Sequence, residues 1–344
     1  MKIEKRLLEL DCLRGIAATM VVVFHLALGQ SGLAIFNLGS TGVELFFVIS
    51  GFVIFLTIEK TTSYKSFLLS RFARLYPAYW ACLTLTTVCI ILWSFLVKTP
   101  VVFPQLKDCL VNITMFQYYF KVKDIDAAYW TLIIELLFYV FILIVYMVKM
   151  ISKIEILGFF IVLFSLLYGT IIKTVTLPVY NFLKGYLPIL AYFPLFIAGI
   201  AFYKIKFYKV NVLRLLLLAL CLITQILLFK STNKVLFITQ GEYAVVIILI
   251  FGVFFLYCFD KLHFILNDVT FFMGKISYSL YLINGYISIY LLMPILMHSK
   301  YFYFNFAIAF LIATPAIIIT ATLINKFIEV PASKYLKNFI TDRN

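Results

Sequence analysis

Long apolar runs separated by short polar segments recur along the whole 344-residue chain. A helix needs about 17–25 mostly apolar residues to cross a bilayer, and the runs reach that length repeatedly. The pattern therefore predicts an all-α polytopic membrane protein with about ten transmembrane helices. The predicted spans, each placed to within several residues, are Ile16–Leu28, Gly42–Ile58, Pro77–Val97, Ala127–Val148, Ile154–Ile172, Leu187–Tyr203, Val212–Phe229, Tyr243–Phe259, Ile276–Met297 and Tyr301–Ile324.

The composition excludes a water-soluble protein. Hydrophobic residues make up 64% of the chain and charged residues 13%, whereas ordinary soluble domains are about 45–50% apolar. The longest outer loop, from Lys98 to Asp126, is too short for an independent enzyme module. We therefore expect a single membrane-embedded domain over residues 1–344 and no separate soluble domain, so that the bundle and its loops carry the function.

The basic residues indicate how the chain is oriented, because cytoplasmic segments collect Lys and Arg. With ten spans, the side of the bilayer that holds the N-terminus receives 19 of the 29 basic residues, the opposite side receives nine, and Arg14 lies at the membrane border. Both termini are therefore predicted to be cytoplasmic. This distribution accounts for the net charge of +14 without a basic domain, so no nucleic-acid partner is expected.

The first apolar run, LDCLRGIAATMVVVFHLAL, carries Asp11, Arg14 and His25. At about 100° per residue, Arg14 and His25 share one face of the helix, roughly 16 Å apart along its axis, and Asp11 joins that face. Charged groups within a span normally face the bundle interior or a wet cavity. The alternatives are a border ion pair between Asp11 and Arg14, and a packing role for His25. A cleaved signal peptide is the other interpretation of this run, but a discarded segment has no use for these side chains.

Two further spans carry a carboxylate. Glu44 lies near the outer end of the second span, at the depth that His25 reaches from the inner side, so the two side chains could meet. A carboxylate beside an imidazole fixes its tautomer and raises its basicity, as a general base requires. The alternative is that Glu44 is solvated at the headgroup level. Glu135, in the fourth span, has Thr131 and Tyr139 one turn before and after it.

Polar side chains also repeat at helical spacing in the ninth span, GKISYSLYLINGYISIYLLMP. Ser277, Tyr281 and Asn284 there predict a neutral hydrogen-bonding face that lines the bundle. Taken alone, each Ser or Tyr has interhelical packing as its alternative role.

The second inner loop, SYKSFLLSRFARLYPAYW, predicts an amphipathic helix. Its apolar stripe includes Arg71 and has Arg74 at the edge, so both arginines are expected to point inward. The stripe consists of Tyr64, Phe67, Leu68, Phe72 and Leu75. Two guanidinium groups at i and i+3 suit a phosphate-bearing ligand. The alternative is an ordinary cytoplasmic loop whose arginines face water or lipid headgroups.

Together these segments resemble acyltransferase family 3, bacterial membrane proteins that transfer acyl groups to hydroxyls of surface glycans and related acceptors. The opening segment resembles the family's Leu-Asp-x-Leu-Arg-Gly motif with its Arg-to-His spacing. GVELFFVISGF, RFARLYPAYW, YWTLIIELLFY, GKISYSLYL and IEVPASKYL resemble the later blocks. Six blocks in the family's order, over nearly the whole chain, make the resemblance specific.

The resemblance implies that Arg14, His25, Arg71, Arg74 and Glu135 are functional, and the polar positions along the spans add the other candidates. Those expected in catalysis are His25, Glu44, Glu135 and Arg14; those expected to bind the acyl donor are Arg71, Arg74 and Arg14; and those expected to line the substrate path are Asp11, Trp130, Ser277, Tyr281 and Asn284. Neither a metal nor a tightly bound cofactor is expected, and acetyl-CoA or another short acyl-CoA is the expected co-substrate.

Three positions depart from the family pattern. Cys12 stands where the family usually has Gly, and Glu44 replaces the commoner Asp, which is one methylene shorter. Asn284 occupies the place of a frequent His, so no acid–base role carries over to it. Some members have an additional extracytoplasmic esterase-like domain, which we do not expect here because the chain stops at Asn344.

The sequence thus predicts a membrane O-acyltransferase of the bacterial cytoplasmic (inner) membrane. It would move an acyl group from cytoplasmic acyl-CoA to a hydroxyl of a cell-surface or lipid-linked glycan, with His25 as general base; direct transfer and an acyl-enzyme both fit. The main alternative is a transporter or flippase of a lipid-linked glycan, and a non-catalytic scaffold is a third. Expected partners are acyl-CoA, the acceptor and the bilayer, with a second copy of the chain or glycan-assembly proteins as further options.

Overall fold

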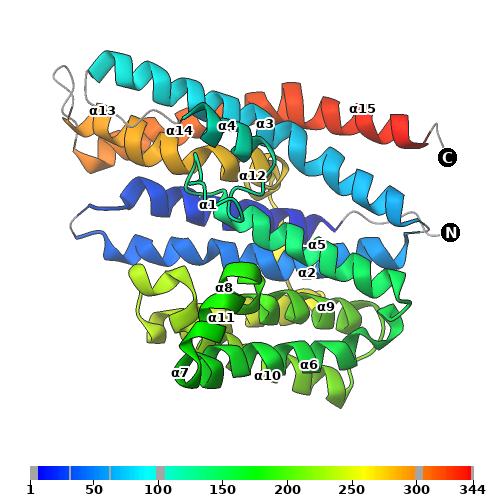
Figure 1. Ribbon diagram of the computed structural model, residues 1–344. Helices are drawn as coiled ribbons and strands as arrows, with labels where there is room; N and C mark the ends of the chain where they lie inside the picture. The colour runs from blue at the N-terminus through cyan, green and yellow to red at the C-terminus, as the bar shows by residue number, and fades with distance from the viewer. Residues whose placement is uncertain (1–6, 31, 62, 98–104, 299–304, 342–344) are drawn as a thin grey trace. The chain divides into compact units, whose positions relative to one another are not determined.

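The computed structural model describes residues 7–30, 32–61, 63–97, 105–298 and 305–341. These residues form helices joined by turns and contain no strand, which confirms the all-α prediction (Figure 1). Six basic residues counted for the orientation lie outside the described residues, as does the predicted start of the last span at Tyr301. The six are Lys2, Lys5, Arg6, Lys98, Lys300 and Arg343.

Nine helices in the described residues are long and apolar enough to cross a membrane, which confirms a multi-pass membrane protein. They are Leu8–Ala27, Ala34–Glu59, Tyr64–Ser94, Trp130–Met147, Ile151–Val175, Val212–Ser231, Gln240–Cys258, Asp268–Met297 and Phe306–Asn338.

The sixth predicted span differs from the prediction. In place of Leu187–Tyr203 the chain forms a 3-10 turn, η4 (Pro188–Ala191), followed by α9 (Phe193–Phe207). With 15 residues, α9 is about 22 Å long, shorter than the roughly 30 Å hydrocarbon core of a bilayer. The cytoplasmic placement of both termini requires an even number of crossings and stays a prediction.

The chain divides into two compact units, each assembled from separate segments. The first unit comprises Met1–Ala17, Ser40–Tyr64 and Ile134–Gly274. Its elements are α2 (Gly42–Glu59), most of α5 (Trp130–Met147), η2 (Ile151–Lys153), α6 (Ile154–Leu167), η3 (Tyr168–Ile172), α7 (Lys173–Val175), α8 (Leu177–Tyr186), η4, α9, α10 (Val212–Leu227), η5 (Leu228–Ser231), η6 (Asn233–Leu236), α11 (Gln240–Cys258) and η7 (His263–Ile265).

Helix α9 forms the core of the first unit. It is apolar on all sides and almost completely buried, as expected for a helix without a polar face. It crosses α2 closely: a Cβ on Gly51 would lie 2.1 Å from the Phe196 carbonyl oxygen, and one on Gly199 would lie 2.2 Å from that of Val48. Only glycine permits this approach, as in other membrane helix pairs with small residues at the contact.

The second unit comprises Ala18–Gly39, Lys65–Ile133 and Lys275–Asn344. Its elements are η1 (Ala34–Thr41), α3 (Tyr64–Val97), α4 (Leu106–Ile113), η8 (Ile287–Leu292), α13 (Met293–His298), α14 (Phe306–Ile324), η9 (Asn325–Glu329) and α15 (Val330–Thr341). Three helices, α1 (Leu8–Ala27), α5 and α12 (Asp268–Tyr286), contribute several residues to both units, and η1 and α3 each have one end in the first unit.

Helix α3 contains both the predicted amphipathic segment and the third span. The prediction that the apolar stripe is the buried face is wrong in part, because Phe67 and Leu75 are buried whereas Tyr64, Leu68 and Phe72 are exposed. Lipid tails are as apolar as leucine, so in a membrane protein an apolar stripe does not by itself identify the face that packs on the core.

Candidate functional site

His25 lies in a buried hydrogen-bond network in the second unit. Its Nδ1 contacts the Oδ1 atom of Asn284, which α12 supplies. The His25 side chain is 7% exposed and Asn284 is fully buried. The sequence placed both residues in the site but did not predict this contact.

The surroundings of Asn284 determine the tautomer of His25. The Asn284 Nδ2 group donates to the backbone carbonyls of Leu280 (3.0 Å) and Tyr281 (2.7 Å). These two bonds assign the amide orientation, so Oδ1 is the atom that faces the imidazole and can only accept. Nδ1 of His25 therefore carries a hydrogen, and in the neutral ring Nε2 is the basic nitrogen. This is the arrangement that a general base needs.

A buried carboxylate, Asp126, holds the end of α12 directly after Asn284. One carboxylate oxygen accepts from the backbone N–H of Ala128 (2.9 Å) and the other from that of Tyr286 (2.7 Å). A Cβ on Gly285 would lie 2.1 Å from the carboxylate, so only glycine fits there. Burial raises the pKa of Asp126 to about 7, although the backbone N–H donors favour its charged form.

Tyr281 connects the same helix to the start of α5. Its hydroxyl lies 2.7 Å from Thr131 Oγ1 and donates to the Ala128 carbonyl at 3.1 Å. Ser277, one turn earlier on α12, is buried, and Trp130, the first residue of α5, is half-buried. The predicted neutral polar face of α12 is thus an interior face of the second unit.

Glu44, in the first unit, is fully buried. The alternative that it is solvated at the membrane border is therefore wrong. Its carboxylate lies 3.4 Å from Nζ of Lys234, which is 3% exposed and also donates to the Ser40 carbonyl. Burial lowers the pKa of Lys234, while the Glu44 carboxylate favours its charged form. The two side chains form a buried ion pair that ties η6 to the start of α2.

Glu135 joins α5 to α2 within the first unit. Its carboxylate accepts hydrogen bonds from the Ser50 hydroxyl (3.1 Å) and from the hydroxyl of Tyr139, one turn later on α5. Of the two polar residues one turn away from Glu135 in the sequence, Tyr139 contacts it, whereas Thr131 bonds to Tyr281.

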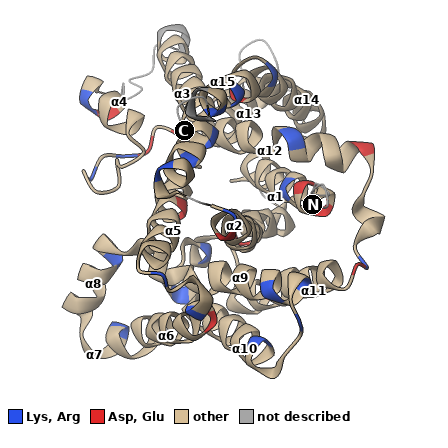
Figure 2. Ribbon diagram, turned by 90° about the vertical axis from the view of Figure 1, so that its right-hand side faces the viewer, with Lys and Arg blue, Asp and Glu red and all other residues tan. Residues whose placement is uncertain are grey.

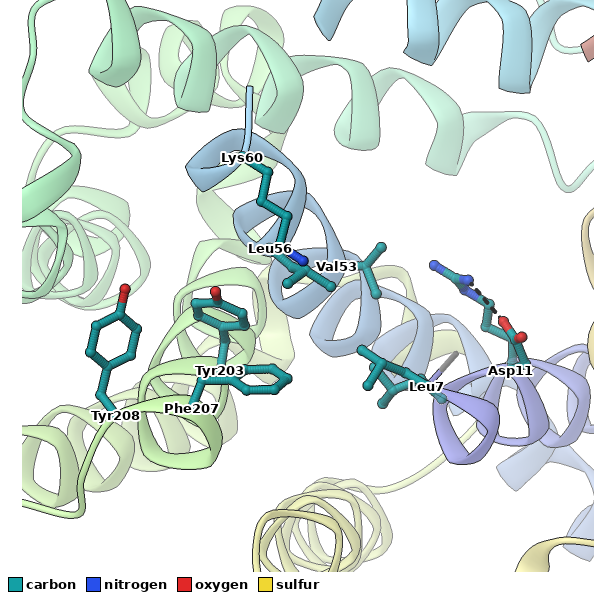
Figure 3. Close-up of a pocket in the computed structure, with 10 residues that line it drawn as sticks. Leu7, Asp11, Val53, Leu56, Lys60, Tyr203, Phe207 and Tyr208 are labelled. Carbon is teal, nitrogen blue, oxygen red and sulfur yellow. Dashed lines mark hydrogen bonds and ion pairs between the residues drawn. The ribbon is translucent and has the colours of Figure 1, made fainter. Parts of the chain in front are cut away.

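Arg14 borders a cavity of about 630 Å³ in the first unit. Figure 3 shows three aromatic side chains of the α9 end, together with Lys60 from the end of α2 and Asp11 from α1. Arg14 lies 3.5 Å from the Asp11 carboxylate, so the ion pair that the sequence offered as an alternative role for these two residues is formed. The cavity is lined by Leu7, Leu10, Asp11, Arg14, Val53, Leu56, Lys60, Tyr203, Phe207 and Tyr208. Two cations, one carboxylate and an aromatic wall suit an anionic ligand with an apolar or flat portion.

Arg71 and Arg74 lie in the second unit on the face of α3 that also carries the buried Phe67 and Ala78. Both arginines are half-buried, and the Arg71 guanidinium is 5.7 Å from the Phe67 ring centroid. Arg74 lines a pocket of about 360 Å³ whose other residues come from the end of η9 and from α15. Figure 2 shows Lys and Arg, in blue, on α3 and α15.

The predicted site residues are distributed over both units. The first unit contains Asp11, Arg14, Glu44 and Glu135, and the second contains His25, Arg71, Arg74, Trp130, Ser277, Tyr281 and Asn284. The structure joins His25, Asn284 and Tyr281 in one network, and the orientation of His25 by Glu44 or Glu135 stays a prediction. In the part of the chain that the structure describes, no group of three or more His, Cys, Asp or Glu side chains could hold a metal ion.

Sequence reasoning missed three features. Asp126 stands in a polar loop, where a carboxylate is usually solvated. The feature of the sequence that could have identified it is its position just before a span that carries Glu135. Lys234 was treated only as a loop charge, although an acid in the neighbouring span requires a partner when buried. Lys334 and Lys337 of α15 were noted only as part of a motif block and of the charge count, yet both line the pocket of Arg74.

Comparison with known proteins agrees with these observations. A family model described as an acyltransferase domain, that of acyltransferase family 3, matches residues 7–326. A protein of Acidianus two-tailed virus named "Putative acetyltransferase ORF330" is 28% identical over 277 residues, which cover 78% of this chain and 79% of that protein. No solved structure matches the chain. The match over residues 7–326, with the motifs in order on a helical membrane fold, shows that the chain belongs to acyltransferase family 3.

Proposed function

We propose that this membrane acyltransferase is an O-acetyltransferase, or uses another short acyl group. It would take the acyl group from cytoplasmic acyl-CoA and transfer it to a hydroxyl of a cell-surface or lipid-linked glycan at the bacterial cytoplasmic membrane. The observation that carries the proposal is the contact between His25 and Asn284, because it leaves Nε2 of a buried histidine as the basic nitrogen.

In this mechanism His25 is the general base. The acceptor hydroxyl gives its proton to Nε2 while its oxygen attacks the thioester carbonyl carbon. The carbon–sulfur bond then breaks, and the CoA thiolate takes the proton from His25, which returns to its neutral form. Asn284 holds the ring in one tautomer throughout, as an amide does beside the histidine of papain-like proteases. General-base catalysis of this kind contributes about 10²–10⁴-fold in rate.

The donor assignment rests on charge and shape. Arg14 and Lys60 border an apolar and aromatic cavity of the first unit, a combination that suits an anionic ligand with an apolar portion, as an acyl-CoA is. Arg71 and Arg74 lie on one face of α3, where guanidinium groups suit phosphate. Glu135 and Glu44 are expected to support the site through their bonds to α2 and η6.

The proposal is tested by acetyl transfer in isolated membranes. Membranes from matched strains with and without the gene receive [¹⁴C]acetyl-CoA, and the label in the glycan fraction is counted and its position mapped by mass spectrometry. We expect label in an ester that is absent without the gene. Equal labelling in the two strains, together with a loss of glycan export, would favour the flippase and contradict the proposal.

A further inference from the structure

The pocket beside Arg74 has a second wall that the family motifs do not assign. We infer that Lys334 and Lys337 of α15 form, with Arg74 of α3, a binding site for a terminal phosphomonoester, the 3′-phosphate of the acyl-CoA donor. This inference rests on the proposed use of acyl-CoA and adds the part of the donor that the site recognises.

The geometry brings basic side chains from distant parts of the sequence into one pocket. Lys334 and Lys337 stand at i and i+3, so they share a face of α15, and both line the pocket with Arg74. Lys337 is also within electrostatic range of Arg71. The polar side chains of Ser333 and Asn338, which also line the pocket, add hydrogen-bonding groups.

The charge balance of the pocket favours an anion. Three cations line it against one carboxylate, that of Glu329, which already accepts a hydrogen bond from Ser279 at 2.5 Å. The charges of Arg71 and Arg74 repel that of Lys337, and an entering anion relieves the repulsion. Basic residues that serve only to orient the chain would be dispersed toward water and headgroups. Here Arg74 of α3 and the two lysines of α15 line the same pocket.

The size and openness of the pocket select the kind of anion. A volume of about 360 Å³ is at the low end for a small-molecule site, which suits one end of the donor and not the whole of CoA. Both lysines are exposed, so the pocket is open and can hold one end of a ligand whose remainder lies outside it. A phosphomonoester carries a charge of about −1.5 to −2 near pH 7, which matches the excess of cations better than a singly charged diester does. A lipid with a phosphomonoester headgroup has the same chemistry.

The test compares CoA with 3′-dephospho-CoA. Full-length protein in phosphatidylcholine nanodiscs is titrated calorimetrically with each nucleotide, as wild type, as Lys334→Gln/Lys337→Gln and as Lys326→Gln. Lys326 is an exposed lysine outside the pocket, so its variant controls for one lost charge. We expect the wild type and Lys326→Gln to bind CoA about 10- to 100-fold more tightly than dephospho-CoA, and the double variant to bind both alike.

A double variant that kept the full preference for CoA would overturn the inference. A second arm distinguishes the phosphate sources: nanodiscs containing phosphatidic acid are examined by native mass spectrometry for retained lipid. Retention that depends on both lysines, with no preference between the nucleotides, would assign the phosphomonoester to lipid and overturn the donor assignment.

Acetyl transfer from acetyl-CoA, measured on the same preparations, separates this inference from the proposed function. Transfer in the wild type with an unchanged CoA preference in the double variant would reject only the α15 site. Absence of transfer in the wild type would reject the proposed function, and the donor inference with it. If both hold, the double variant should show a raised KM for acetyl-CoA and an unchanged kcat, because the phosphate lies away from the reacting atoms.

Discussion

Each unit of this acyltransferase holds a buried polar network, and the two are of different kinds. In the second unit His25, Asn284 and Asp126 are linked through an amide and backbone groups, whereas in the first Glu44 and Lys234 form an ion pair. A neutral amide orients an imidazole without fixing its charge, while the opposite charges of a buried pair favour each other's charged form and so offset part of the cost of burial. The neutral network therefore suits a histidine that gains and loses a proton, and the ion pair suits a structural link.

Breaking the ion pair should give the largest effect. Lys234→Met leaves the Glu44 carboxylate buried without its cation, which costs about 3–5 kcal/mol of stability in comparable cases. We expect a large fall in melting temperature, or loss of folded protein, by size-exclusion chromatography in detergent. The double variant Glu44→Leu/Lys234→Met removes both charges and should recover most of the loss. A single variant as stable as the wild type would show that the pair has no structural role.

Removing Asn284 should affect catalysis more than folding. Asn284→Ala deletes the acceptor for His25 Nδ1, so the ring loses its fixed tautomer, and we expect kcat to fall by about 10²-fold. Asn284→Asp restores an acceptor and should recover part of the rate. The measurement is acetyl transfer by equal amounts of folded protein. If Asn284→Ala transferred at the wild-type rate, the network around His25 would be packing alone.

A smaller effect is expected from Asp126, whose contribution to the stability of the protein should depend on pH. Its pKa is raised by burial to about 7, against about 3.9 in an unfolded chain. Between these values the folded protein holds a proton that the unfolded chain lacks, so the contribution of this carboxyl to stability falls by about 1.4 kcal/mol per pH unit as pH rises to 7, and is level above it.

The check is the melting temperature of the wild type relative to Asp126→Asn, which cannot ionise. The melting temperature of the wild type, relative to that of Asp126→Asn, should fall steadily between pH 5 and pH 7 and should fall no further at pH 8. Parallel profiles for the two proteins would show that Asp126 does not take up a proton in the folded state.

The sequence predicted the membrane helices well because a run of apolar residues has few alternatives in a bilayer. It failed at α9, where an apolar run of span length is broken by Pro188 and by the turn at Tyr192. It also assigned three exposed residues of α3, Tyr64, Leu68 and Phe72, to the core, since periodicity separates apolar from polar faces but does not separate lipid-facing from core-facing ones.

The site was predicted as a set of residues and not as a set of contacts. The contacts of Arg14 with Asp11 and of Glu135 with Tyr139 could be inferred from the sequence, because the residues of each pair are three or four positions apart on one helix. The partners of His25 and Glu44 were not, because Asn284 and Lys234 are distant in the sequence. Spacing along a single helix carries no information about such pairings.

The central claim is that His25 is the general base, and His25→Gln tests it most directly. Glutamine keeps a polar side chain at this position but does not accept a proton near neutral pH. Acetyl transfer from labelled acetyl-CoA to the glycan fraction is measured in membranes that contain equal amounts of wild-type and variant protein, with CoA binding as the control for folding. We predict unchanged CoA binding and a loss of transfer of about 10²-fold or more. Transfer at nearly the wild-type rate would make His25 a packing residue and contradict the mechanism.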